Sequence, residues 1–244
     1  MLAKTDELFL FRESGGSRTA ILENISIEVP ERSFECIMGP SGSGKTTLLY
    51  LIAGLEPVSA GRVWLADEEI ERLKETVRTR LRRTQVAFVF QYFHLLPNLT
   101  VRENIALPLW IRGQNRGWQE PATRWGERLG LGPRLDALPH ELSGGERQRA
   151  SIARAMVGEQ PLILADEPTG NLSQKAGAEV MQILREAVDQ EGRTVLLVTH
   201  NPRDAAHADR VRFLLDGQLA DDPVLVGPGL TVDAVHQALA QLEI

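Results

Sequence analysis

A glycine-rich segment, GPSGSGKTT at residues 39–47, constrains the fold of this chain more than any other feature. It matches the pattern G-x-x-x-x-G-K-[ST] in full, it follows the apolar run FECIM at 34–38, and it precedes the helix-compatible run TTLLYLIAG. Glycines let such a loop turn tightly, so that its backbone N–H groups point inward at a phosphate. We therefore predict that this loop binds a nucleoside triphosphate.

Two side chains of the loop have specific chemical roles. The Lys45 ammonium can reach the β- and γ-phosphates, which also makes it a predicted catalytic residue, and the Thr46 hydroxyl can ligate Mg²⁺. The predicted nucleotide-binding residues of the loop are Gly39, Pro40, Ser41, Gly42, Ser43, Gly44, Lys45, Thr46 and Thr47.

The rest of the chain alternates between two kinds of segment. Short continuous apolar runs, typical of strands buried on both faces of a parallel sheet, occur at 34–38, 86–90, 161–165 and 194–198. Helix-compatible stretches lie between them, at 45–53, 146–157 and 176–190. Strands that alternate with helices predict an α/β core with a parallel sheet.

Three regions fall outside this alternation. Residues 24–29, NISIEV, alternate apolar and polar side chains and predict a half-buried strand. The polar, tryptophan-bearing segment 100–140 predicts a helical subdomain attached to the core. After the chain break VGPG at 226–229, apolar residues recur at helical spacing, which favours a helix docked on the core over a helix that binds a partner.

Composition narrows the functional classes. The formal net charge of −6 gives no electrostatic footprint for nucleic acid, so no nucleic-acid partner is expected, and RTRLRR at 79–84 is interpreted as a solvated helix face. The single cysteine, Cys36, lies in an apolar run and is expected to be buried in a reducing compartment. No run approaches the length of a membrane span and the N-terminus does not resemble a signal peptide, so a cytoplasmic protein is expected.

Polar residues follow three of the apolar runs. Asp166 and Glu167 end the run PLILA, where one carboxylate can address Mg²⁺ and the other can act as general base toward water. His200 ends the run TVLLV and could donate a hydrogen bond to a γ-phosphate, or be only a polar turn residue. Gln91 ends VAFVF and could fill a Mg²⁺ or water position, or merely cap the strand.

A second glycine-rich loop, SGGE at 143–146, opens a predicted helix. Ser143 and Glu146 have the spacing of a capping box, so a purely structural role is one interpretation. The unpaired N–H groups of a helix N-terminus also bind phosphate, which is the other interpretation.

The order of these motifs, from the phosphate loop through the strand-end glutamine, LSGGERQR and LILADEP to the final TH, resembles the ATP-binding cassette (ABC) ATPase family over about residues 5–220. The resemblance implies a P-loop NTPase core with a parallel sheet, an N-terminal antiparallel β subdomain and an inserted helical subdomain at about 95–158. A single ATPase domain at 1–225 would be followed by a C-terminal helical extension at 226–244.

The resemblance also implies roles for individual residues. Glu167 would be the catalytic base and His200 the switch histidine, while Gln91 would join Thr46 and Asp166 at Mg²⁺ and link that site to a membrane partner. Leu142–Glu146 would be the signature, whose Ser143, Gly144, Gly145 and Glu146 bind the γ-phosphate of ATP held by another subunit. Phe11, or less favourably Phe9, would stack on adenine. Ser173 departs from the family, which usually has an aspartate there; serine can still cap the next helix.

Within the family, VFQYFHLLPNLTVRENIALPL at 89–109 and PTGNL resemble ATPases that work with lipoprotein-releasing, macrolide-efflux and cell-division permeases. The resemblance implies a homodimer in the ATP-bound state and an integral-membrane permease on a separate chain, with the ATPase peripheral on the inner face of the cell membrane. An importer ATPase and a soluble ABC ATPase not coupled to transport are the alternatives.

Overall fold

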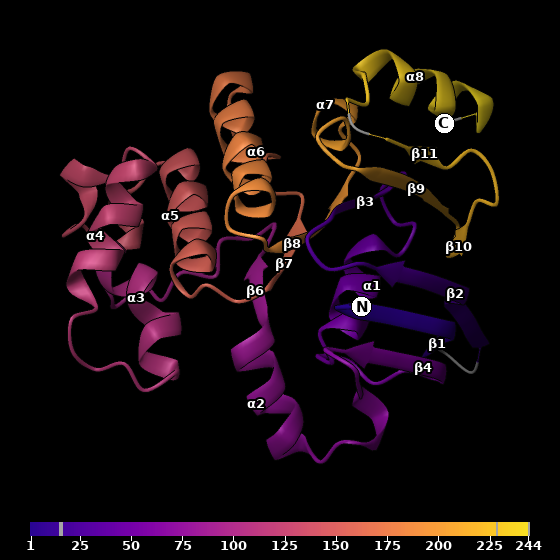
Figure 1. Cartoon of the computed structure of the whole chain (residues 1–244), viewed down its shortest axis with the longest axis horizontal. Coiled ribbons are helices and arrows are strands. Elements are labelled where there is room, and N and C mark those ends of the chain that lie inside the picture. Colours follow the sequence, from indigo (N-terminus) through magenta and orange to yellow (C-terminus); the bar gives the residue numbers. More distant parts are fainter. Residues whose placement is uncertain (15–16, 228, 244) are drawn as a thin grey trace.

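Two β-sheets form the frame of the computed structural model, which describes residues 1–14, 17–227 and 229–243. The first sheet has the strand order β2-β1-β4-β5 and is antiparallel, which confirms the antiparallel N-terminal subdomain. Its strands are β1 (Ala3–Ser14), β2 (Ser17–Val29), β4 (Ala60–Leu65) and β5 (Glu68–Glu69). In Figure 1 this sheet lies on the side of the molecule opposite the helices α3, α4 and α5.

The second sheet contains the four predicted buried strands. Its strand order is β10-β9-β3-β8-β7-β6, and the five strands from β9 to β6 are parallel. These five are β3 (Phe34–Met38), β6 (Val86–Val89), β7 (Leu162–Asp166), β8 (Thr194–Thr199) and β9 (Arg210–Leu215). Two short strands, β10 (Gln218–Leu219) and β11 (Leu225–Val226), pair antiparallel with β9. The sequence therefore identified four of the five parallel strands.

Eight α-helices lie among the described residues. They are α1 (Lys45–Ile52), α2 (Glu75–Gln85), α3 (Val101–Ile111), α4 (Gln119–Arg128), α5 (Gly144–Val157), α6 (Gln174–Asp189), α7 (Pro202–Ala205) and α8 (Val232–Gln241). Three 3₁₀ turns add Ile70–Arg72, Gly132–Arg134 and Pro139–Glu141. Helices α3, α4 and α5 gather at one end of the molecule, within the segment predicted to form a helical subdomain (Figure 1).

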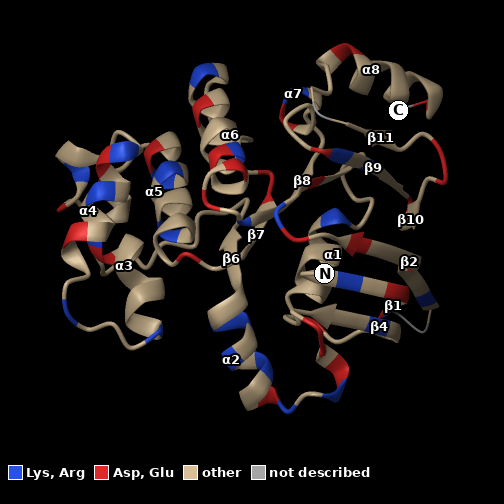
Figure 2. Cartoon of the chain, in the orientation of Figure 1, with Lys and Arg blue, Asp and Glu red and all other residues tan. Residues whose placement is uncertain are grey.

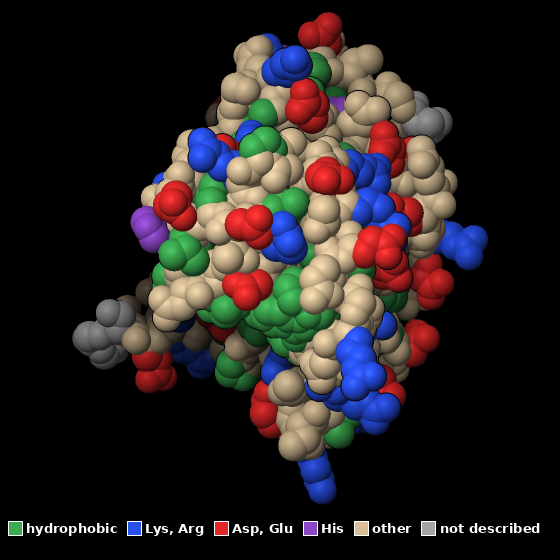
Figure 3. Space-filling model, turned by 90° about the vertical axis from the view of Figure 1, so that its left-hand side faces the viewer, with side chains coloured by type: hydrophobic (Ala, Val, Ile, Leu, Met, Phe, Trp, Pro, Cys, Tyr) green, Lys and Arg blue, Asp and Glu red, His purple; other side chains and the backbone are tan. Residues whose placement is uncertain are grey.

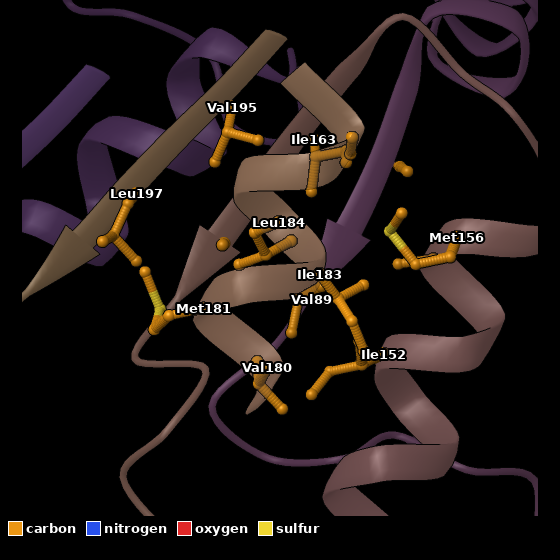
Figure 4. Close-up of a cluster of buried hydrophobic side chains, with 14 of the residues drawn as sticks. Val89, Ile152, Met156, Ile163, Val180, Met181, Ile183, Leu184, Val195 and Leu197 are labelled. Carbon is orange, nitrogen blue, oxygen red and sulfur yellow. The ribbon is translucent and has the colours of Figure 1, made fainter. Parts of the chain in front are cut away.

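Burial on both faces of the parallel sheet explains the continuous apolar runs. Successive residues of a strand point to opposite faces. In β7, Ile163 and Ala165 join a core that includes α5 and α6, whereas Leu162 and Leu164 join a core shared with α1 and the antiparallel sheet. Figure 4 shows the first of these cores, where Ile163 lies among side chains from neighbouring strands and from both helices. Cys36 belongs to it and is fully buried, as expected.

The basic stretch at 79–84 forms part of α2, a helix with no buried residues. Figure 2 shows it extending from the body of the molecule, with Lys or Arg positions coloured blue along its length. This confirms the interpretation of a solvated helix face. No helix in the described ranges is both long enough and apolar enough to span a bilayer.

The C-terminal segment packs on the core as a helix. Val235 and Ala238 of α8 are buried in the same core as α5 and α6, and Leu239 packs against it. Strand β11, which pairs with β9 of the second sheet, spans residues 225 and 226. The predicted boundary between the ATPase domain and the C-terminal extension therefore falls within a strand. Residues 228 and 244 of the predicted extension lie outside the described residues, and the division into domain and extension stays a prediction.

Candidate active site

The glycine-rich loop lies where neighbouring parallel strands end. Strand β3 leads directly into it, β8 pairs with β3, and β7 pairs with β8. Because these strands are parallel, residues that follow β7 and β8 lie at the same sheet edge as the loop. A cleft of about 540 Å³ opens there, lined by the loop together with Gln91, Glu167 and His200. Segments far apart in the sequence therefore meet in one site.

Close packing explains two of the glycines. Gly44 has a φ of 101°, and a Cβ there would lie 2.7 Å from the Leu22 side chain of β2. A Cβ at Gly39 would lie 2.1 Å from the carbonyl oxygen of Leu214 in β9. Since neither distance is compatible with a side chain, glycine is needed at both positions to seat the loop between the two sheets.

The polar groups of the loop fit an anionic ligand. Lys45 Nζ donates hydrogen bonds to the carbonyl oxygens of Gly39 and Pro40, each at 2.8 Å. Burial lowers the pKa of Lys45, while the neighbouring carboxylates of Glu167 and Asp166 oppose that shift. Within the part of the chain that the structure describes, the buried Ser43 Oγ has no hydrogen-bond partner. A phosphate group would supply acceptors to both the ammonium and the hydroxyl.

Oxygen ligands beside the loop fit Mg²⁺. The Thr46 hydroxyl donates to Asp166 Oδ1 at 3.0 Å, and the Asp166 side chain is buried, which raises its pKa. The described residues contain no group of three or more His, Cys, Asp or Glu side chains placed to hold a metal. Mg²⁺ commonly binds through one or two protein oxygens together with substrate phosphates. The pair Thr46 and Asp166 suits that mode, with the Gln91 side chain in the same cleft.

Glu167 is held in an uncommon backbone conformation, with a φ of 45°. Its N–H donates to the carbonyl oxygen of Val198 at 3.0 Å. Its carboxylate is 2.7 Å from His200 Nδ1 through Oε1 and accepts from the Thr199 hydroxyl at 3.3 Å through Oε2. Strained conformations of this kind persist where the surroundings over-determine them, typically at functional sites. The strand ends thus fix the carboxylate at the cleft.

One buried contact near the site was not predicted from the sequence. The Thr169 hydroxyl, two residues after Glu167, donates to Asp204 of α7, which begins just after His200. Both side chains are buried, and burial raises the pKa of Asp204. The contact joins the segment that carries Glu167 to the segment that carries His200. No local pattern signals it, because Thr169 and Asp204 are distant in sequence.

The second glycine-rich loop forms the capping box at the start of α5. Glu146 N–H donates to Ser143 Oγ at 3.3 Å, and Ser143 N–H donates to Glu146 Oε2 at 2.8 Å. Hydrogen bonds from Ser143 are the main cause of the lowered pKa of Glu146. Within the described ranges, no residue of this loop lines the cleft of the first loop. One chain therefore presents two separate glycine-rich loops.

The expected adenine contact receives no support from this geometry. Among the described residues, the cleft lining includes Arg12 of β1 and Ile21 of β2, but not Phe11. The Phe11 ring stacks on Phe9 at a centroid distance of 6.0 Å and lies 3.9 Å from the guanidinium of Arg18. Phe11 as an adenine contact stays a prediction.

A phosphate loop between a buried strand and a helix, with carboxylates at the end of another strand of the same parallel sheet, defines a P-loop nucleoside triphosphatase. The antiparallel sheet and the inserted helices are the further features that the resemblance to the ABC family implied. The chain belongs to the ABC transporter family, whose match covers residues 22–170.

Similar proteins of known sequence and structure agree with this assignment. The chain is 41% identical over 206 residues to the lipoprotein-releasing system ATP-binding protein LolD of Shewanella oneidensis, covering 84% of this chain and 90% of that protein. It is 42% identical over 204 residues to the macrolide export ATP-binding/permease protein MacB of Campylobacter jejuni, covering 83% of this chain and 32% of that longer protein.

A solved structure of the ATP-binding cassette MJ0796, described as a dimeric post-hydrolysis state bound to ADP and Pi, matches with a TM-score of 0.87. The two chains are 34% identical, and the match covers 92% of this chain and 98% of that one. These findings confirm the predicted family and fold class. The chain is an ATP-hydrolysing subunit of the ABC type.

Proposed function

We propose that two copies of this chain bind two Mg²⁺–ATP molecules between them, head to tail, and that their closure drives a membrane permease on a separate chain. The permease would be of the lipoprotein-release or macrolide-efflux type. The observation that carries the proposal is the pair of separated glycine-rich loops: one lies in a cleft with the predicted catalytic residues, and the other, whose Ser143 is exposed, opens α5.

Within one chain, the cleft residues would have different roles in ATP binding and hydrolysis. Lys45 would bind the β- and γ-phosphates, and Thr46, Asp166 and Gln91 would hold Mg²⁺, which neutralises charge on the phosphates when bound. Glu167 would take a proton from the attacking water, a contribution of about 10²- to 10⁴-fold in such sites. His200, already in contact with the Glu167 carboxylate, would orient that carboxylate and contact the γ-phosphate.

The second loop would act on the ATP of the other chain. Its glycines expose the first N–H groups of α5, and the positive end of the helix dipole favours a phosphate there. Ser143, Gly144, Gly145 and Glu146 would therefore contact the γ-phosphate held by the partner cleft. Hydrolysis would then depend on association, with ATP stabilising the closed dimer and hydrolysis releasing it.

A groove beside Gln91 supports the permease partner. It has a volume of about 420 Å³ and runs between β6, α3 and α5, with Phe88, Phe90, Leu96, Pro108 and Ile111 among its lining residues. An apolar groove of this kind fits an amphipathic helix. Figure 3 shows the neighbouring face of α3, α4 and α5, where hydrophobic side chains gather among charged ones. Docking there would hold the chain at the inner face of the membrane.

The solution mass of Glu167→Gln, measured with and without Mg²⁺–ATP, tests the dimer. Blocking the base should trap the closed state, so ATP should convert monomer to dimer. The double variant Ser143→Arg with Glu167→Gln should bind ATP in its own cleft and remain monomeric, because the second loop acts on the partner. A double variant that dimerises like the single one would refute the role of the second loop.

The permease proposal has its own test, which also separates the alternatives. The chain should copurify with a membrane protein, and Leu96→Asp in the groove should abolish that association while leaving ATP binding intact. Copurification with no membrane protein would favour a soluble ABC ATPase. A partner that imports its substrate would favour the importer alternative.

A further inference from the structure

The cleft extends beyond the phosphate loop toward the antiparallel sheet. Ile21 and Arg12, from β2 and β1 of that sheet, line the same cleft as Lys45, Thr46 and Glu167. The loop also contacts β2 directly, since a Cβ at Gly44 would lie 3.0 Å from the Ile21 carbonyl oxygen. A nucleotide whose phosphates occupy the loop would therefore direct its base toward Ile21 and Arg12.

The pleat of β1 decides which of its side chains can reach that base. Leu8 and Leu10 are buried in the core beneath the antiparallel sheet, whereas Phe9 and Phe11 stack on each other at the sheet's other face. Arg12 is next in the alternation and lines the cleft. The aromatic rings of this strand are thus turned away, and the side chain presented to the base is a guanidinium.

The Arg12 side chain is exposed enough to contact a ligand, and an ion pair with Glu56 partly fixes its orientation. Its side chain is 59% exposed, and Nη2 lies 3.5 Å from Glu56 Oε1, a residue in the segment between α1 and β4. An ion pair this exposed contributes little to folding. It can nevertheless restrict the directions in which the guanidinium plane points.

We propose that Arg12 packs its guanidinium plane against the nucleobase, with Ile21 beside it, and that this chain has an arginine in place of an aromatic base contact. The inference rests on the proposed binding of a nucleoside triphosphate in the cleft. A planar guanidinium stacks on bases, as in nucleic-acid recognition. Stacking accepts any base because every base has a π-face. The base contact should therefore favour ATP and GTP to similar extents.

The test compares the affinities of wild type and three Arg12 variants for ATP, GTP and inorganic tripolyphosphate, each with Mg²⁺, by isothermal titration calorimetry. Arg12→Ala should weaken binding of both nucleotides by about five- to fifty-fold and leave tripolyphosphate affinity unchanged. Arg12→Tyr keeps a planar group without charge and should stay near wild type. Arg12→Lys keeps the charge without the plane and should behave like Arg12→Ala.

Arg62 provides the matched control, since it lies on β4 of the same sheet, is 54% exposed and pairs with Asp6. Arg62→Ala should bind all three ligands like wild type. Equal losses of ATP and tripolyphosphate affinity in Arg12→Ala would identify Arg12 as a phosphate ligand and overturn the proposal. Unchanged ATP affinity in Arg12→Ala would also overturn the proposal. So would an Arg12→Lys variant that binds ATP like wild type if Arg12→Tyr binds ATP more weakly. A wild-type protein that binds neither ATP nor tripolyphosphate would instead overturn the proposed function.

Discussion

Arg154 connects the helix that carries the second glycine-rich loop to the segment after Gln91. From α5 it donates hydrogen bonds to the carbonyl oxygens of Phe93 at 2.8 Å and His94 at 2.6 Å. Burial lowers the pKa of Arg154 to about 10, which still leaves the guanidinium charged at neutral pH. The same side chain lines the apolar groove. Arg154→Met keeps much of the side-chain length and removes both hydrogen bonds.

The expected cost follows from those contacts. Hydrogen bonds to charged groups contribute ~1.5–3 kcal/mol each when buried, but the released carbonyls lie near the surface and can bind water. The desolvation of the guanidinium is also relieved. We therefore expect a net loss of about 1–2 kcal/mol, which for a chain of this size lowers Tm by roughly 2–8 °C.

Differential scanning calorimetry measures the stability change, and hydrogen exchange measures its location. Amides of residues 92–96 should exchange faster in Arg154→Met, while those of β7 and β8 keep their relative protection. Arg72→Met is the control, because Arg72 is 75% exposed and its ion pair with Glu69 lies at the surface. A Tm within about 1 °C of wild type, with unchanged exchange at 92–96, would show that Arg154 does not anchor this segment.

Three further predictions concern the cleft and the loop after it. Lys45→Ala should abolish measurable ATP binding in calorimetry because it removes the charge that faces the phosphates; unchanged affinity would refute the phosphate-loop assignment. Asp166→Asn should stop hydrolysis yet raise the Tm of the nucleotide-free protein. Burial raises the pKa of Asp166, so its contribution to stability is present at low pH and is lost as pH rises through that pKa; the gain in Tm should therefore vanish in acid, and a gain independent of pH would exclude this cause. Ser173→Asp, at the N-cap of α6, should make ATP hydrolysis more cooperative, and a Hill coefficient equal to that of wild type would show that the serine has no effect.

The strands of the parallel sheet could be predicted because burial on both faces leaves a continuous apolar run. Their neighbours in the sheet could not. The sequence order β3, β6, β7, β8 becomes the spatial order β3, β8, β7, β6, and this depends on packing across the whole core. The motifs at the strand ends were nevertheless sufficient to place Lys45, Gln91, Glu167 and His200 in one cleft, because parallel strands end at a common edge.

In the antiparallel sheet, the sequence did not determine which side chains face the cleft. Strand β1 has register shifts against β2 between Thr5 and Leu8, between Leu8 and Leu10, and between Leu10 and Phe11. Because the side-chain period of a strand is two, a displacement of one residue exchanges the two faces. The sequence predicted an adenine contact at Phe11, but it could not tell which face of β1 meets the cleft. The contact between Thr169 and Asp204 was equally inaccessible, since it depends on two loops that meet only in the folded chain.

The position of β3 has a consequence for how the protein is made. Both of its neighbours in the sheet, β8 and β9, begin only at Thr194 and Arg210. At synthesis rates of roughly 5–20 residues per second, on the order of ten seconds separate the emergence of β3 from that of its first partner. During that interval an apolar strand has two unpaired edges, which is an aggregation hazard. The phosphate loop therefore cannot acquire its native support while the ribosome is still translating the helical subdomain, and β3 stays without its partners until β8 and β9 have been made.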